Sequence, residues 1–289
     1  MDKCYLCNGD ASTLHVGVRD NNDIDVLQCT KCGLVFLSSF EHINNELYCD
    51  DQMRKSSVEL NITTSEKRDD LRRYEFMKEK ISGKKLLDFG CGAGGFLLKA
   101  KNEAKLAHGV ELNKTLCDSI NKTNIKNIKC FSSISDTKDK YDIITLFHVL
   151  EHLKDPIASL NEISSKVDIM SGGGIIIEVP SSDDALLKLY RCPEFADFTF
   201  WSYHLFLFNP KTLSMLFGSL EKKVNIEYIK QVQRYPLSNH LYWLARGKPG
   251  GHQKWHFLGN DMIGSQYEYA LASIGACDTI IAQISFGRE

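Results

Sequence analysis

The feature that most constrains this chain is a glycine-rich turn between a short apolar run and a helix-forming segment. The apolar run occupies 85–89, and Gly90, Gly92 and Gly94 follow it at alternate positions. Glycines at such a junction let the backbone turn tightly and let a ligand lie against the main chain. The turn therefore predicts a ligand site at the carboxyl end of a strand.

The alternation of strands and helices continues along the chain. Continuous apolar strands alternating with helices indicate a mostly parallel sheet covered on both faces. We therefore predict an α/β chain with a Rossmann-like, doubly wound sheet. The expected strands are 85–89, 107–111, 125–131, 141–147, 174–179, 224–232 and 279–286, and the main helices are 66–81, 96–104, 114–122, 155–167, 183–190 and 210–220.

Four of the ten cysteines form two pairs near the start of the chain. Cys4 and Cys7 make one pair and Cys29 and Cys32 the other, each with two intervening residues. Two such pairs on adjacent turns can place four thiolates around one tetrahedral zinc ion. Because sulfur would then fill all four positions, we predict a structural zinc in a small N-terminal ribbon.

Composition narrows the class of protein. The 289 residues carry 35 basic and 37 acidic side chains, a formal net charge of −2, so no general attraction to nucleic acid or anionic lipid is expected. No apolar run approaches the roughly 20 residues that span a bilayer. The first residues also lack the apolar core of a signal peptide. The expectation is a cytoplasmic protein without a nucleic-acid or membrane partner, and the oligomeric state stays open.

We predict three regions along the chain. Residues 1–40 form the zinc-binding ribbon, and 41–82 form a linker and a helix. Residues 83–289 form the cofactor-binding domain, with an aromatic-rich insertion at about 234–275. The segment 233–243 mixes aromatic rings with Arg, Asn and His, so it suits either a carbohydrate contact or a buried aromatic helix.

Two segments carry a resemblance to a known family. Residues 86–94, Leu-Leu-Asp-Phe-Gly-Cys-Gly-Ala-Gly, resemble motif I of class I S-adenosylmethionine-dependent methyltransferases, and 141–156 resembles the segment around their fourth strand. With a four-cysteine zinc module before it, such a domain is similar to the sugar methyltransferases of deoxysugar and surface-polysaccharide pathways. The resemblance covers roughly 70–235. It implies S-adenosylmethionine as cofactor and a small-molecule sugar or nucleotide-sugar as acceptor.

The resemblance also assigns residues to each part of the cofactor. The turn glycines approach its amino-acid part, and the acid of the preceding strand lies beneath them. An acid after the next strand holds the ribose, a serine flanks the adenine, and two residues at the end of the fourth strand lie beside the methionine portion. The implied set is Asp88, Gly90, Gly92, Gly94, Glu111, Leu112, Ser132, Phe147 and His148.

Three histidines are candidates for the catalytic step. Methyl transfer to a hydroxyl requires a group that removes the hydroxyl proton, and histidine titrates near neutral pH. His148 and His152 follow the fourth strand, while His204 follows the fifth strand and a helix and can return over the same edge. We predict His204 as the general base, with His148 and His152 shaping the acceptor pocket. Related sugar C-methyltransferases carry a Glu-His pair where Tyr203-His204 stands, which favours O-methylation here.

The predicted function is therefore transfer of a methyl group from S-adenosylmethionine to a sugar hydroxyl, on a nucleotide-linked sugar or a surface-glycan precursor. Two other classes stay open. One is a zinc-ribbon RNA-binding or RNA-modifying protein. The other is a nicotinamide-dependent oxidoreductase, because Gly90, Gly92 and Gly95 followed by Glu111 also fit the dinucleotide fingerprint. Asp88 counts against a dinucleotide, since its carboxylate would repel a diphosphate at the turn.

Overall fold

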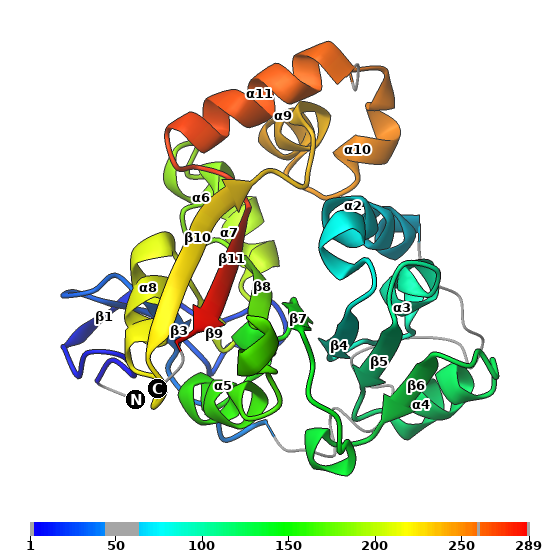
Figure 1. Ribbon diagram of the computed structural model, residues 1–289. Helices are drawn as coiled ribbons and strands as arrows, with labels where there is room; N and C mark the ends of the chain where they lie inside the picture. Colours follow the sequence, from blue (N-terminus) through cyan, green and yellow to red (C-terminus); the bar gives the residue numbers. More distant parts are fainter. Residues whose placement is uncertain (1–2, 44–63, 259–260, 288–289) are drawn as a thin grey trace.

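Two β-sheets organise the computed structural model, which describes residues 3–43, 64–258 and 261–287 (Figure 1). The larger sheet has seven strands, in the spatial order β10 (Val224–Val232), β11 (Thr279–Phe286), β8 (Gly174–Pro180), β7 (Ile143–Phe147), β4 (Lys85–Phe89), β5 (Leu106–Val110) and β6 (Ile128–Phe131). The pairs from β8 through β6 are parallel, and β11 runs antiparallel to both of its neighbours. The predicted Rossmann-like, mostly parallel sheet is confirmed.

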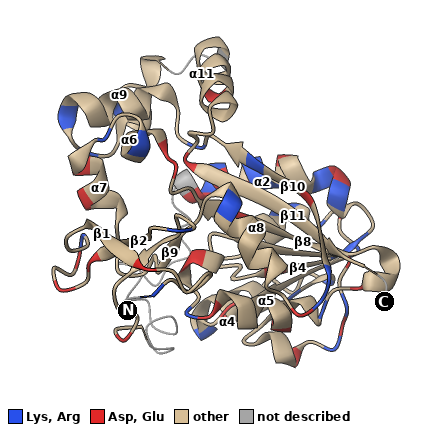
Figure 2. Cartoon of the chain, turned by 90° about the vertical axis from the view of Figure 1, so that its left-hand side faces the viewer, with Lys and Arg blue, Asp and Glu red and all other residues tan. Residues whose placement is uncertain are grey.

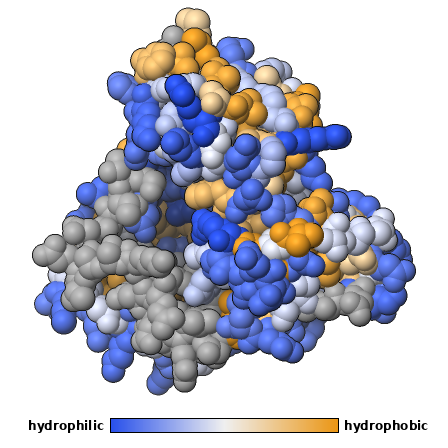
Figure 3. Space-filling view, turned by 180° about the vertical axis from the view of Figure 1, so that it is seen from behind, coloured by the Kyte–Doolittle hydropathy of each residue, from blue (hydrophilic) through white to orange (hydrophobic). Residues whose placement is uncertain are grey.

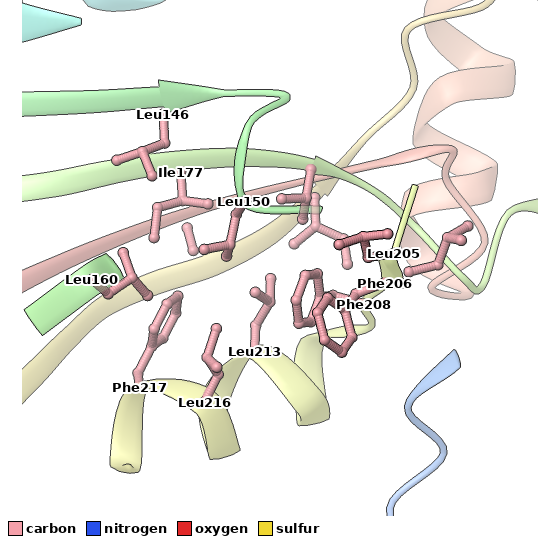
Figure 4. Packing of buried hydrophobic residues seen from close by; sticks show 14 of the residues in the cluster. Leu146, Leu150, Leu160, Ile177, Leu205, Phe206, Phe208, Leu213, Leu216 and Phe217 are labelled. Atoms are coloured by element: carbon pink, nitrogen blue, oxygen red, sulfur yellow. The ribbon is translucent and has the colours of Figure 1, made fainter. Parts of the chain in front are cut away.

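Helices cover both faces of this sheet. Successive strand residues point to opposite sides, so a continuous apolar strand places apolar side chains on both faces. In β8, Ile176 packs into one apolar cluster, while Ile175 and Ile177 pack into the other. The first cluster is completed by α2 (Thr64–Ile81), α3 (Gly95–Ala100) and α4 (Lys114–Asn121), and the second by α5 (Pro156–Ser164) and α8 (Pro210–Gly218). Figure 4 shows Leu213, Leu216 and Phe217 of α8 facing Leu146 and Ile177 of the sheet.

The smaller sheet joins the N-terminal region to a distant part of the chain. Its strands are β1 (Ala11–His15), β2 (Val26–Cys29), β3 (Val35–Leu37) and β9 (Phe206–Leu207), all antiparallel. Phe206 is fully buried, with its ring 5.3 Å from Tyr5 and 5.1 Å from Phe40. A strand from after the fifth parallel strand therefore completes the sheet that carries the cysteine pairs. The predicted division at residue 40 stays a prediction, and most of the predicted linker lies outside the described residues.

The segment between β10 and β11 forms a separate helical layer. It contains α9 (Leu237–Arg246), α10 (Gly251–Lys254) and α11 (Asp261–Ser273), which lie beyond the carboxyl end of β10 (Figure 1). Two short helices, α6 (Ala185–Lys188) and α7 (Pro193–Thr199), connect β8 to β9. Among the described residues, no helix is both long and apolar enough to cross a membrane.

Candidate functional site

The glycine-rich turn lies between β4 and α3, as the sequence predicts. Gly90, Gly92 and Gly94 have φ values of 76°, 55° and 76°, in the left-handed region that side chains disfavour. A Cβ atom at Gly90 would lie 2.5 Å from Val149 Cγ2, and one at Gly94 would lie 2.9 Å from Ile120. Glycine is therefore required here both by backbone conformation and by space.

Glu111 directs its carboxylate back to this turn. β5 is the parallel neighbour of β4, so the residue after β5 lies beside the residues after β4. Glu111 Oε2 accepts a hydrogen bond from the Gly92 amide at 2.8 Å, and Oε1 accepts one from the Asn113 amide at 2.9 Å. A carboxylate has two acceptor oxygens, which suits a pair of ribose hydroxyls. Leu112, beside it, is exposed.

Asp88 lies beneath the turn, inside the protein. Its side chain is 4% exposed, and its carboxylate accepts a hydrogen bond from Thr145 Oγ1 at 2.7 Å. Burial raises the pKa of Asp88 to about 7, although the Thr145 hydrogen bond opposes the shift. An acid here can respond to a cationic group held at the turn.

The other predicted cofactor residues lie along the same edge of the sheet. Phe147 ends β7 with its ring 5.2 Å from the ring of Phe96, and the Arg73 guanidinium lies 4.9 Å above it. Ser132 directly follows β6 and is exposed. Seen from behind, the surface is hollowed between the helical layer and the sheet, and hydrophilic residues lie within the hollow (Figure 3). The binding roles of all these residues stay predictions.

His148 occupies a constrained position after β7. Its φ is 57°, uncommon for a residue with a side chain, and its amide donates to the Glu178 carbonyl at 2.8 Å. Ring atom Nε2 lies 2.9 Å from Nη1 of Arg234, and Nδ1 lies 3.0 Å from Oε1 of Glu151. Because a guanidinium only donates, Nε2 must accept, and Nδ1–H therefore donates to Glu151.

A buried network of charges surrounds His148. Arg72 Nη2 lies 2.8 Å from both oxygens of the fully buried Glu178, and Arg73 Nη2 lies 2.8 Å from one of them. Burial disfavours the charge on Glu178, but the guanidinium groups of Arg73 and Arg72 hold its pKa well below the usual value. Arg234 donates to Asp69 through Nε and Nη2 and to His148 through Nη1.

Sequence reasoning did not find this network. Arg72 and Arg73 lie on α2 and Asp69 precedes them by one helical turn, with no motif to mark them. One signal was present, because Glu178 interrupts the apolar run of β8. A charge inside a buried strand requires a partner.

The three predicted histidines do come together. The rings of His152 and His204 lie 5.0 Å apart, and both lie beside the ring of Trp201. His152 Nδ1 is 2.7 Å from the Tyr203 carbonyl oxygen, and the Leu205 amide donates to the Glu151 carbonyl at 2.9 Å. Burial, with the nearby His152, lowers the pKa of His204 to about 3, so the free imidazole is a weak base. Its role as general base stays a prediction.

The cysteine pairs converge as their spacing predicts. Cys4 Sγ lies 3.5 Å from Cys32 Sγ, Cys7 Sγ lies 3.4 Å from Cys29 Sγ, and all four sulfurs lie within 4.8 Å of one another. Zinc bound tetrahedrally at about 2.3 Å from each sulfur separates the sulfurs by about 3.8 Å. The amides of Lys31 and Cys32 also point at Cys29 Sγ, each at 3.4 Å. The four residues therefore fit a zinc ion.

The remaining cysteines that the structure describes are buried and are not part of this cluster. They are Cys91, Cys117, Cys130, Cys192 and Cys277. Cys49 lies outside the described residues.

Most of the segment 233–243 lies in helix α9, which begins at Leu237. Asn239, His240, Tyr242 and Trp243 of α9 are all buried. His240 Nδ1 lies 2.7 Å from the hydroxyl of Tyr267 on α11. The burial of these side chains favours the buried aromatic helix, and the carbohydrate contact stays a prediction.

Comparison with known proteins agrees with this geometry. A family model described as a methyltransferase domain matches residues 64–220, more than half of the chain. A ubiquinone biosynthesis O-methyltransferase from Nitrosospira multiformis is 29% identical over 90 residues, which are 28% of this chain and 37% of that protein. The chain thus matches little more than a third of the length of this curated relative.

Solved structures show the same fold. Magnesium protoporphyrin IX methyltransferase from Synechocystis PCC 6803 with bound SAH superposes with a TM-score of 0.51, covering 84% of this chain and 98% of that one, at 10% identity. The N-methyltransferase NodS from Bradyrhizobium japonicum WM9 in complex with S-adenosyl-L-homocysteine gives a TM-score of 0.50, covering 85% and 100%, at 11% identity. With its sheet order, its glycine turn and a family match over most of that sheet, this chain belongs to the methyltransferase-domain family.

Proposed function

We propose that the protein transfers a methyl group from S-adenosylmethionine to a hydroxyl of a sugar, on a nucleotide-linked sugar or a surface-glycan precursor. The observation that carries the proposal is the Glu111 carboxylate bonded across to the amide of Gly92. This contact supports a site in which Glu111 binds the ribose and the adjacent glycine turn lies against the amino-acid part of the cofactor. Asp88 beneath the turn favours a cationic ligand over a diphosphate, which separates this reading from a nicotinamide site.

The acceptor is proposed to lie over Trp201, Tyr203 and the histidine cluster. The rings of Trp201 and Tyr203 are 4.7 Å apart, and both side chains are partly exposed. Aromatic faces of this kind support sugar rings, and neighbouring imidazoles can bond to hydroxyls. This region, whose aromatic side chains are more exposed than those of α9, is the proposed carbohydrate surface.

Methyl transfer to a hydroxyl has three requirements: a methyl donor, a positioned acceptor oxygen and a group that removes the hydroxyl proton. Bound S-adenosylmethionine supplies the methyl group on a positively charged sulfur. The residues at the edge of β7 hold the acceptor oxygen in line with that methyl carbon, which reduces the entropy cost of reaction. The hydroxyl must also lose its proton, and His148, His152 and His204 are the side chains brought together there. Of these, the predicted base is His204.

A structural zinc ion is proposed for the N-terminal module. Support comes from the four convergent sulfurs of Cys4, Cys7, Cys29 and Cys32 and from the two amides directed at Cys29. A shell of four thiolates leaves no position for a substrate, so the metal would act through folding alone.

The RNA-binding alternative has less support. Figure 2 shows lysines and arginines interspersed with acids over the described part of the chain, rather than gathered along one face. A nucleic-acid surface needs a clustered positive charge.

The acceptor class is tested by incubating the protein with methyl-labelled S-adenosylmethionine and a panel of acceptors. The panel contains nucleotide-linked sugars, a catechol and an RNA mixture, and product is measured after separation. We expect label in the sugar fraction. Label confined to the catechol or to RNA would contradict the sugar proposal while leaving methyl transfer intact.

A further inference from the structure

A second cluster of metal-ligating side chains lies beside the proposed acceptor surface. Glu151, His152 and His204 each offer one ligand atom, and these three atoms lie within 4.8 Å of one another. Glu151 is 0% exposed, yet its Oε2 has no hydrogen-bond partner among the described residues. Leaving a buried carboxylate oxygen unpaired is more unfavourable than leaving a neutral polar group unpaired. The cluster therefore lacks a cation or donor that the described chain does not supply.

The surrounding hydrogen bonds orient the three side chains as ligands. His152 Nδ1–H donates to the Tyr203 carbonyl at 2.7 Å, so Nε2 is the ring atom that could act as a metal ligand. His148 donates to the other Glu151 oxygen, Oε1, at 3.0 Å and so fixes the carboxylate. Imidazoles and carboxylates that bind metals in proteins are held by outer partners of this kind.

We infer that Glu151, His152 and His204 bind one divalent transition-metal ion whose open positions take a hydroxyl oxygen of the acceptor. Two imidazoles and one carboxylate suit ions such as zinc, iron or cobalt, and three protein ligands leave room for substrate. The binding site stands on its own, but its role in activating the acceptor rests on the proposed function.

The chemical role follows from the charge of the ion. A bound divalent ion lowers the pKa of an oxygen ligand, so the acceptor hydroxyl loses its proton to water. An oxygen lone pair then forms the bond to the methyl carbon as the carbon–sulfur bond breaks, and that electron pair stays on sulfur. In this arrangement His204 is a metal ligand instead of the general base.

The experiment is a titration of the full chain with Co²⁺, after loading with one equivalent of zinc to fill the four-cysteine site, followed by calorimetry and visible absorption. Zinc binds more tightly than cobalt, so Co²⁺ should not displace zinc from the cysteines. Absorption would reveal displacement directly, because cobalt–thiolate bonds give strong charge-transfer bands. We expect one Co²⁺ per chain with bands of nitrogen and oxygen ligands only.

Variants separate ligands from neighbours. His152→Ala, His204→Ala and Glu151→Gln should each weaken Co²⁺ binding by more than the roughly 10–100-fold expected for loss of an outer partner, and His148→Ala by about that range. The exposed His256 gives the control, since His256→Ala should leave binding unchanged. Binding of S-adenosylhomocysteine by each variant checks that it is folded.

Three outcomes distinguish the metal site from the proposed function. If the wild-type protein binds S-adenosylhomocysteine but no Co²⁺ outside the cysteine cluster, the metal site is overturned and the proposed function stands. Equal Co²⁺ affinity in wild-type protein and in folded His152→Ala or His204→Ala would also overturn it. If Co²⁺ binds as expected but S-adenosylhomocysteine does not, the metal site holds and the proposed function fails.

Discussion

At the scale of single residues, two acids at one edge of the sheet have different surroundings. The Glu111 carboxylate accepts hydrogen bonds from two backbone amides, those of Gly92 and Asn113. Asp88 is buried beneath the turn with one hydroxyl partner, Thr145. The surroundings of Glu111 suit a carboxylate that stays charged and binds a ligand. The charge on Asp88 is unfavourable because it is buried, and a cationic ligand can compensate it.

Asp88 should make stability depend on pH. Its folded pKa of about 7 lies above the ordinary aspartate value of 3.8, so the folded state binds the proton more tightly than the unfolded state. Stability is therefore lost as pH rises from about 4 to about 7. Asp88→Asn removes this loss, and at pH 8, without cofactor, it should raise the free energy of unfolding by about 2–4 kcal/mol.

Urea denaturation at pH 8 and at pH 5 measures this effect. The gain from Asp88→Asn should shrink at pH 5, and the exposed Asp118→Asn on α4 should change stability little at either pH. A gain of equal size at both values would show that Asp88 does not carry a shifted titration.

At the scale of secondary-structure elements, β9 links the zinc module to the histidine cluster. β9 pairs with β3 through Phe206 and Leu207, and the Leu37 amide donates to the Leu205 carbonyl at 3.1 Å. His204 directly precedes these residues. The module that holds the cysteines therefore also positions one side of the proposed acceptor site.

Substitution of one zinc-ligating cysteine tests whether the zinc module stabilises β9. Because metal binding supplies folding energy to such a module, Cys29→Ser should speed amide hydrogen exchange in β2, β3 and β9 but not in β4. Binding of S-adenosylhomocysteine should stay within about threefold of wild type, while methyl transfer falls at least tenfold. Cys277→Ser, at a buried cysteine outside the cluster, is the matched control. Unchanged exchange in β9 after loss of zinc would contradict the link.

At the scale of the whole molecule, the sequence predicted those parts of the structure that depend on local pattern. The strands expected at 224–232 and 279–286 are β10 and β11, because β-branched and aromatic residues recur along both segments. The helix expected at 183–190 is shorter, since α6 spans only Ala185–Lys188. Arg191 follows it with a φ of 50°, and Pro193 opens the next helix.

Contacts between segments far apart in the chain could not be predicted from the sequence. β9 has two residues and pairs with a strand about 170 positions earlier, so no local pattern marks it. The contacts of Arg72 and Arg73 with Glu178 likewise depend on how α2 packs against β8. In the candidate site, the glycine turn and the cysteine spacing are local motifs, so both could be predicted. The partners of His148 come from three separate segments of the chain, so they could not.

Calorimetric titration of the protein with S-adenosylhomocysteine tests the central claim most directly. We expect one molecule bound per chain, and Glu111→Ala should weaken binding at least tenfold with the fold intact, since charge-assisted hydrogen bonds contribute about 1.5–3 kcal/mol each. NADH serves as the competing ligand and should not bind. Absence of S-adenosylhomocysteine binding at millimolar concentration, or affinity unchanged in Glu111→Ala, would contradict the account of this site.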